Sequence, residues 1–294
     1  ISCDYTKPAA EKAAIVIAEM NEKMPFVGGD NQIHVSKLDY IIPCSYDLPE
    51  IPAPEISEVE KNIGKHCASL IDDGSTLQVG IGAIPEAVLL FLKDKKDLGI
   101  HTEMFSDGVV ELIKSGVITG NRKTLHPKKI VSTFLMGSRN LYDFVDNNPD
   151  VELYPVDYTN DPWVIGKNEK LISINSCMEV DLMGQVAAES LGLRQFSGVG
   201  GQVDYLRGVA VSRGGKSIIA MPSTAANGTK SRIVPFLTEG AAITTSRNDL
   251  DYIITEYGIA HLRGRTLKQR AECLIRIAHP NFREMLMEEY DKRF

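Results

Sequence analysis

The feature that most constrains the fold is an alternation of short apolar runs with helical runs. Three apolar runs are predicted strands, at 76–82, 100–105 and 129–136. The runs before and between them are predicted helices, at 57–71, 85–95 and 108–116. Strands separated by helices are typical of parallel sheets, because a parallel crossover needs about a dozen residues. We therefore expect an α/β fold with a parallel or mixed sheet flanked by helices.

Residues outside this block add further expectations. Pro8 suits the first turn of a helix, and we expect that helix to cover residues 8–24. A proline-rich stretch at 43–56 is typical of a stiff connector, so we place a domain boundary there. Further on, residues 208–213 are predicted to form a strand and residues 266–278 a helix.

Composition disfavours several classes of partner. The 294 residues carry a formal net charge of −7, which argues against a nucleic-acid or anionic-membrane surface. No apolar run approaches the roughly 18 residues of a membrane span. Five dispersed cysteines lack a C-x-x-C pair, and six histidines lack metal-ligand spacing. We therefore expect no disulfide framework, no metal, and a reducing, cytoplasmic compartment.

A carboxylate interrupts the predicted strand at 100–105. Glu103 occupies a position where buried strands normally carry apolar residues. One interpretation is a frayed strand whose Glu103 faces solvent. Another is a covalent nucleophile, because carboxylates attack activated acyl groups when oxyanion donors lie nearby. The rival nucleophile is Glu179, which shares a predicted strand face with Asp181, although such a face is more commonly a solvated surface.

Three loop segments could bind a ligand. Residues 79–88 (VGIGAIPEAV) place glycines between a strand and a helix, where backbone N–H groups can bind a phosphate or an oxyanion. The spacing imitates a dinucleotide fingerprint, but proline replaces the third glycine, and a plain tight turn is the alternative. Residues 196–208 are dense in glycine, which indicates a close ligand approach or a flexible loop. Residues 221–235 carry hydroxyls, Lys230 and Arg232, which suit a phosphate or a polar surface loop.

Several segments, in one order, resemble the acetyl-CoA hydrolase/transferase family over essentially the whole chain. They are DYTKPAAEKA, GSTLQVGIGAIPEAVLLFL, HTEMFSDGVVEL, MEVDLMGQV, QFSGVGGQVDYLRG, MPSTAANGTKSRIVP and TEYGIAHLRGRTLKQRAECLIRIAHPNFRE. Long motifs in a fixed order are far more specific than one glycine loop. The resemblance implies a CoA-transferase-like fold, with residues 1–52 as the end of a preceding α/β domain plus linker. Residues 53–294 are then the domain that carries the catalytic glutamate. It also implies a further N-terminal part upstream, and we expect a homodimer.

The resemblance implies a CoA-transferase that exchanges CoA between short-chain carboxylates, 4-hydroxybutyrate or butyrate with acetyl-CoA or acetate. The family's nucleophile is the glutamate of a T-E-x-x-x-D-G segment, which is Glu103 here. The implied route is ping-pong, through acyl-glutamyl anhydrides and a glutamyl-CoA thioester. Coenzyme A is then a substrate, and no permanently bound cofactor is expected.

The same resemblance assigns roles to the loops. Gly201 matches a glycine whose N–H faces the reacting carbonyl, and Asn160 matches an active-site asparagine. The positions that match CoA-binding residues are Gln78, Val79, Gly80, Ile81, Gly82, Ser197, Gly201 and Lys230.

Three alternatives stay open. An acyl-CoA hydrolase would use the same glutamate, with water replacing the acceptor carboxylate in the last step. A dinucleotide-binding module would bind NAD and not CoA. A non-catalytic scaffold would bind CoA weakly or not at all, and would tolerate loss of Glu103. Titration with each cofactor, and transfer to acetate compared with release of free CoA, would separate them.

Overall fold

The computed structural model describes all residues from Ile1 to Phe294. At its centre is a nine-stranded sheet, in the order β2 (Gly28–Gly29), β9 (Val151–Leu153), β7 (Ile130–Ser132), β5 (Gly99–His101), β4 (Thr76–Gln78), β10 (Leu171–Asn175), β15 (Lys216–Ala220), β19 (Tyr252–Thr255), β20 (Gly258–His261). All neighbours are parallel except β19 and β20. The expected α/β fold with a parallel or mixed sheet is therefore confirmed.

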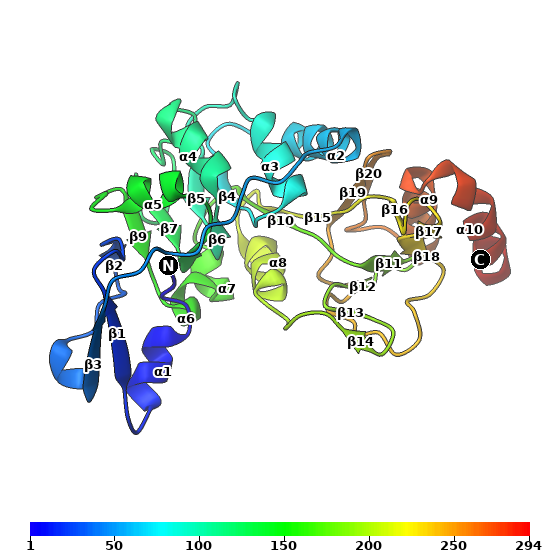
Figure 1. Ribbon diagram of the computed structural model, residues 1–294. Helices are drawn as coiled ribbons and strands as arrows, with labels where there is room; N and C mark the ends of the chain where they lie inside the picture. Colours follow the sequence, from blue (N-terminus) through cyan, green and yellow to red (C-terminus); the bar gives the residue numbers. More distant parts are fainter.

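Helices cover both faces of this sheet. Figure 1 shows α2 (Glu58–Ser69), α3 (Ala83–Leu90), α4 (Asp107–Lys114) and α5 (Arg139–Val145) on one side, and α6 (Val156–Thr159), α7 (Pro162–Ile165) and α8 (Gln202–Val211) on the other. Adjacent residues of the central strands accordingly enter different cores. On β15, Ile218 packs in the largest core with α2, whereas Ile219 packs in a second core with Leu206 of α8.

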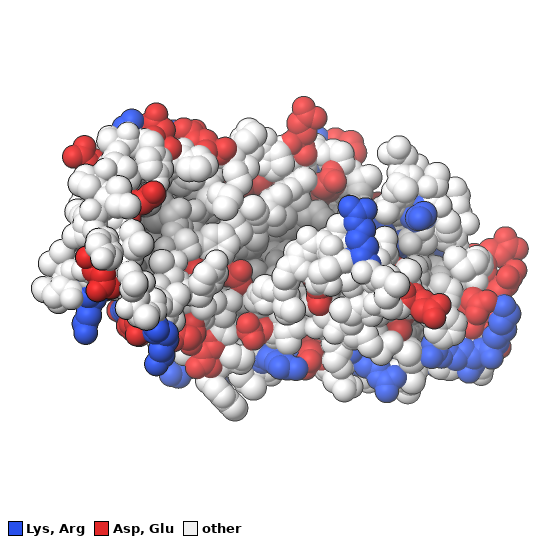
Figure 2. Space-filling view, turned by 60° about the horizontal axis from the view of Figure 1, so that its bottom comes forward, with Lys and Arg blue, Asp and Glu red and all other residues white.

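The C-terminal half adds a second lobe beside the first (Figure 1). It contains a three-stranded sheet, with β11 (Glu179–Asp181) between β12 (Val186–Ala187) and β18 (Ile233–Val234), and two hairpins, β13–β14 (Ser190–Leu191, Arg194–Gln195) and β16–β17 (Thr224–Ala225, Lys230–Ser231). Helices α9 (Leu267–Ile277) and α10 (Pro280–Arg293) close this lobe. Figure 2 shows that the middle of one face is hollowed and largely uncharged, with charged side chains gathered along its edges.

The N-terminal segment differs from its prediction. Helix α1 (Thr6–Lys12) ends well before residue 24, and Ile17–Asn21 forms strand β1 instead. Strand β1 pairs in parallel with β3 (Tyr40–Cys44), so that Ile17 lies opposite Tyr40. A short 3₁₀ turn, η1 (Val35–Lys37), precedes β3. The predicted helix over 8–24 is therefore wrong from residue 13 onward, because residues 17–21 pair with a strand more than 20 residues away along the chain.

Two further local predictions are wrong and two are confirmed. Residues 208–213 were expected to form a strand, but most of them lie in α8, whose buried Tyr205 and Val209 are four residues apart. The predicted strand at 100–105 divides into β5 and β6 (Met104–Phe105), and β6 pairs with β8 (Phe134–Leu135) in a separate sheet. The helices expected at 57–71 and 266–278 are present as α2 and α9. No helix combines the length and the apolar character needed to cross a membrane.

Candidate active site

Glu103 lies in the break between β5 and β6, just beyond the carboxyl end of a central parallel strand. Its carbonyl oxygen accepts hydrogen bonds from the backbone N–H groups of Thr133 and Phe134, at 3.1 and 3.0 Å. The Ser132 hydroxyl donates to the same oxygen at 2.9 Å. These donors fix the backbone of Glu103, in an α/β fold where ligands commonly bind beyond the carboxyl ends of strands.

The Glu103 side chain meets two other predicted catalytic residues. Asn160 Nδ2 donates to Glu103 Oε2 at 2.8 Å. Gly201, the residue that precedes α8, directs its backbone N–H to the same carboxylate. A Cβ atom on Gly201 would overlap both Glu103 Oε2 and Asn160 Nδ2. The fold therefore brings Glu103, Asn160 and Gly201 together, and the crowding requires glycine at position 201.

Opposing effects act on the Glu103 carboxyl group. Burial is the largest and raises its pKa above the ordinary value of 4.5. Hydrogen bonds from Asn160 and Gly201 lower the pKa, whereas the charges of Asp4 and Asp204 raise it. The net direction is upward. A partly desolvated carboxylate, oriented by two donors at the positive end of a helix, is well prepared to act as a nucleophile.

Two buried residues that the sequence did not reveal hold Asn160 in place. The carbonyl oxygen of Thr159, the preceding residue, accepts hydrogen bonds from His101 Nε2 at 2.9 Å and from the Tyr205 hydroxyl at 3.2 Å. Burial lowers the pKa of His101 to about 3, so its ring is neutral and carries its proton on Nε2. The only sequence signal was a polar residue inside the apolar run of β5.

The five predicted CoA-binding positions at 78–82, where strand β4 leads into the first glycine segment, divide into an anchored part and an open part. The Thr102 hydroxyl accepts a hydrogen bond from the backbone N–H of buried Val79 at 3.2 Å and donates one to the Val79 carbonyl oxygen at 2.8 Å. Gln78 is also buried, and its Oε1 accepts from Ser173 Oγ at 2.6 Å and from Asn175 Nδ2 at 3.0 Å. These contacts engage Gln78 and Val79 within the protein.

The open part is residues 80–82, which lead into α3. A Cβ atom on Gly80 or Gly82 would meet nothing within 4 Å. Gly82 has φ of 111°, which side chains rarely adopt, and Ile81 is 41% exposed. Of the five positions predicted in this segment, these three can therefore face a ligand.

The second glycine segment, residues 196–208, leads directly to Glu103. Its exposed part includes Ser197, whose hydroxyl donates to the carbonyl of Gly198 at 2.8 Å. Gly200 has φ of 64°, and the next residue is the buried Gly201 beside Glu103. A ligand that lies along this loop would therefore approach Glu103 at its end.

The third segment is an ordered hairpin, β16–β17. The Ser223 hydroxyl at its base donates to Glu256 Oε1 at 2.6 Å. The Arg232 guanidinium donates to the carbonyl groups of Cys177 and Met178, at 2.9 Å each. These two bonds hold the Arg232 guanidinium against the β11 segment, and the suggestion that Arg232 supplies charge to a phosphate stays a prediction. Lys230 is exposed, and the structure shows no contact between it and Glu103.

The rival carboxylates on β11 are occupied within the protein. Glu179 accepts hydrogen bonds from the backbone N–H of Thr238 at 2.6 Å and from its hydroxyl at 3.0 Å. Asp181 accepts from Gln185, at 2.8 Å from the backbone and 2.7 Å from the side chain. Both acids are buried, so the solvated strand face expected for them is wrong. Elsewhere, no three His, Cys, Asp or Glu side chains converge as metal ligands would.

Comparison with known proteins identifies the family. Residues 137–290 match the acetyl-CoA hydrolase/transferase C-terminal domain, and residues 1–47 match the N-terminal domain of the same family. The 4-hydroxybutyrate coenzyme A transferase of Clostridium kluyveri is 65% identical over 294 residues, which are 100% of this chain and 68% of that protein. The succinyl-CoA:cyclohexane-1-carboxylate CoA transferase of Geobacter metallireducens is 50% identical, over 98% of this chain and 66% of that protein.

The solved structures agree. The crystal structure of a 4-hydroxybutyrate CoA-transferase from Porphyromonas gingivalis superposes on this chain with a TM-score of 0.90 at 56% identity. The match covers 100% of this chain and 70% of the crystallised chain. The chain thus spans about two thirds of the length of the curated relatives it matches. It belongs to the acetyl-CoA hydrolase/transferase family and is, within that family, a CoA-transferase.

Proposed function

We propose that this CoA-transferase exchanges CoA between short-chain carboxylates through a covalent intermediate on Glu103, with 4-hydroxybutyrate or butyrate and acetyl-CoA or acetate as its substrates. One observation carries the mechanism. The Glu103 carboxylate lies beyond the end of a central strand, 2.8 Å from Asn160 Nδ2 and against the N–H of Gly201. The choice of substrates rests on the 65% identity to a relative named for 4-hydroxybutyrate. The shared family alone does not select these acids, because a 50% identical relative is named for other acids.

The first half of the reaction would use Glu103 as the nucleophile. A Glu103 oxygen attacks the thioester carbonyl of acyl-CoA. The carbon–sulfur bond breaks, and its electron pair leaves with the CoA thiolate, which produces an acyl-glutamyl anhydride. Asn160 and Gly201 orient the attacking carboxylate, which is partly desolvated and therefore reacts without first losing a full hydration shell.

The thiolate then attacks the glutamyl carbonyl of the anhydride. The carbon–oxygen bond breaks, the acid departs as its carboxylate, and Glu103 is left as a CoA thioester. A second carboxylate reverses the two steps and leaves as the new acyl-CoA, so no net proton transfer is needed. During each attack on the glutamyl carbonyl its oxygen becomes negative, and the Asn160 Nδ2 and Gly201 N–H donors stabilise that charge.

The open loops supply the surface that we propose for CoA. Residues 80–82 and Ser197 have open space or exposed side chains where a ligand could lie, and Lys230 offers an exposed positive charge for a phosphate group. Contacts to the nucleotide and the pantetheine arm lie far from the reacting carbonyl, and they would orient the thioester at Glu103. Such remote binding energy can lower the barrier of the chemical step.

Trapping the intermediate tests the proposal. The full-length protein is incubated with acetyl-CoA or butyryl-CoA and reduced with borohydride, and the digest is analysed by mass spectrometry. We expect an alcohol in place of the Glu103 carboxylate, and an unmodified Glu179 peptide in the same digest. Modification at Glu179, or none at all, would contradict the assignment. Release of free CoA at a rate that does not depend on an acceptor acid would identify a hydrolase instead.

A further inference from the structure

The side chain of Glu86, which is not the proposed nucleophile, links the first turns of helices α3 and α4. Glu86 lies in the first turn of α3, and its side chain accepts hydrogen bonds from the Ser106 hydroxyl and from the backbone of Gly108. Ser106 precedes α4, and Gly108 lies in its first turn. Glu86 therefore caps a helix other than its own.

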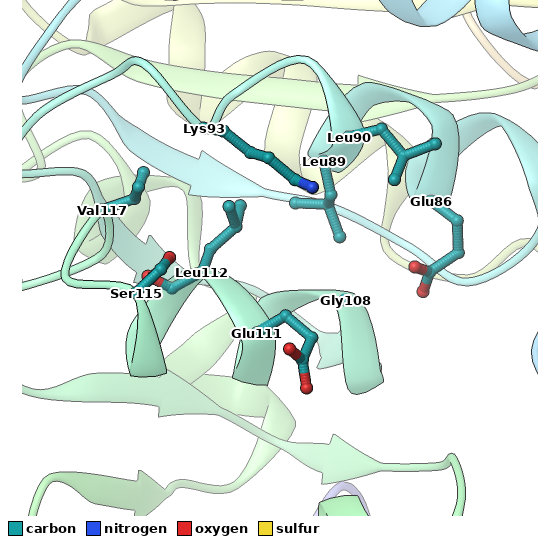
Figure 3. A pocket seen from close by; sticks show the side chains of 9 residues that line it. All are labelled: Glu86, Leu89, Leu90, Lys93, Gly108, Glu111, Leu112, Ser115 and Val117. Carbon is teal, nitrogen blue, oxygen red and sulfur yellow. The ribbon is translucent and has the colours of Figure 1, made fainter.

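The contact is close and partly buried. Burial raises the pKa of Glu86, and the hydrogen bonds from Ser106 and Gly108 lower it. A Cβ atom on Gly108 would overlap Glu86 Oε2, so glycine is needed for the approach. Figure 3 shows Glu86 at one end of a pocket of about 470 Å³ between α3 and α4, near the turn that contains Gly108.

Both linked helices begin at the candidate active site. Helix α3 starts directly after the open residues 80–82, and Ser106 follows Glu103 by three residues. Asp107 extends the link to α5, because its carboxylate accepts from Ser138, at 2.8 Å from the backbone and 2.6 Å from the hydroxyl. The position of Glu103 relative to the glycine loop therefore depends on how these helix starts are joined.

We propose that Glu86 is a positioning residue for the transferase reaction. It holds the start of α4 against the start of α3, so that Glu103 meets a thioester bound at residues 80–82. The inference rests on the proposed function, because it assumes that Glu103 is the nucleophile. The structure shows no contact between Glu86 and the Glu103 carboxylate, and Glu86 lines a pocket with Ile81 and Gly82, so the test must separate positioning from binding.

The test compares Glu86→Ala and Glu86→Gln with Glu111→Gln. A displacement near 1 Å can cost about 100-fold, so for Glu86→Ala we expect kcat to fall roughly 10- to 100-fold while KM for acyl-CoA changes less than about 3-fold. For Glu86→Gln we expect partial rescue, since one amide oxygen can accept from one of the two donors. Glu111 lines the same pocket but is exposed, so Glu111→Gln should behave as wild type.

The rate of Glu103 adduct formation, measured at a temperature where thermal unfolding shows each variant to be folded, separates positioning from stability. Equal rates in wild type and Glu86→Ala would overturn the inference alone. An increase in KM with unchanged kcat would make Glu86 a binding element and would also overturn it. A wild type that forms no adduct would overturn the proposed function and this inference together. If Glu86→Ala does not fold, Ser106→Ala removes one side of the link, and an unchanged adduct rate in that variant would be equally decisive.

Discussion

The segment of the proposed nucleophile, residues 103–108 (the nucleophile segment), and three exposed segments (the open loops) are built in opposite ways. The open loops are residues 80–82, residues 196–200 and the end of the β16–β17 hairpin at 226–230. In the nucleophile segment the Glu103 carbonyl takes three donors, its carboxylate takes two, and the following turn is capped from another helix. In the open loops a Cβ atom on Gly80, Gly82, Gly198 or Gly200 would meet nothing within 4 Å.

The difference shows where this site is preorganised. Hydrogen bonds fix Glu103 before any substrate arrives, and if Glu103 is the reacting group this is the condition for efficient electrostatic catalysis. In the open loops the constraint is backbone conformation, with φ of 111° at Gly82 and 64° at Gly200, and the space above the backbone is free. Changes in the nucleophile segment and its donors should therefore lower turnover, whereas changes in the open loops should alter binding.

The largest effect should come from Glu103 itself. Glu103→Gln removes the nucleophile, and we expect transfer to fall roughly 10⁴- to 10⁶-fold, as for other lost covalent nucleophiles. Glu103→Asp keeps the carboxylate but withdraws it by one methylene, which should cost about 100-fold. Steady-state transfer from acetyl-CoA measures both. Transfer near the wild-type rate in either variant would refute the nucleophile role.

Two glycines of one loop give the sharpest contrast between the regions. Gly201→Ala places a methyl group where Glu103 and Asn160 lie, and it disturbs an oxyanion donor, so we expect kcat to fall roughly 100- to 1,000-fold. Gly198→Ala places its methyl group in open space, and kcat should change less than about 3-fold. Full turnover in Gly201→Ala with weakened CoA binding would make that position a binding element.

Loss of Asn160 should change both rate and pH dependence. Hydrogen bonds to charged groups contribute about 1.5–3 kcal/mol, so Asn160→Ala should lower kcat roughly 10- to 100-fold. Asn160 lowers the pKa of Glu103, and without it the effect of burial is less opposed. Because only the ionised carboxylate attacks, the acid limb of kcat/KM should move to higher pH.

A pH–rate profile of transfer measures that movement, with Asn140→Ala as the control. Asn140 accepts a hydrogen bond from Lys114 on the surface, at 3.1 Å, and should leave the acid limb unchanged. An acid limb that moves to lower pH in Asn160→Ala would show that Asn160 does not stabilise the charged form of Glu103.

Local patterns predicted the parts of the fold that local interactions determine. Helices α2 and α9 carry capping boxes and amphipathic faces, and both were expected. Strand β1 was missed because its partner β3 lies more than 20 residues along the chain, and only that pairing makes Ile17–Asn21 a strand. Residues 208–211 were mistaken for a strand because short apolar runs do not separate a helix from a buried strand.

The site shows the same limit. The sequence alone drew attention to Glu103, as a carboxylate in an apolar run, and to the glycine-dense loop that ends at Gly201. Asn160 came only from the family resemblance, since it is separated from Glu103 by 57 positions and meets it through the sheet topology. His101, Tyr205 and Glu86 position the reacting groups through contacts that no spacing in the chain indicates.

The smallest effect, and the test of the open loops, should come from Lys230. Its side chain is exposed on the β16–β17 hairpin, while Arg232 nearby is committed to carbonyl groups of the fold. If Lys230 binds a phosphate of CoA, Lys230→Ala should raise KM for acyl-CoA roughly 3- to 10-fold, leave kcat unchanged and reduce the dependence of KM on salt. Lys230→Arg keeps the charge and should restore most of the affinity. A fall in kcat with KM unchanged would show that the open loops also position the reacting groups, and the division between the two regions would fail.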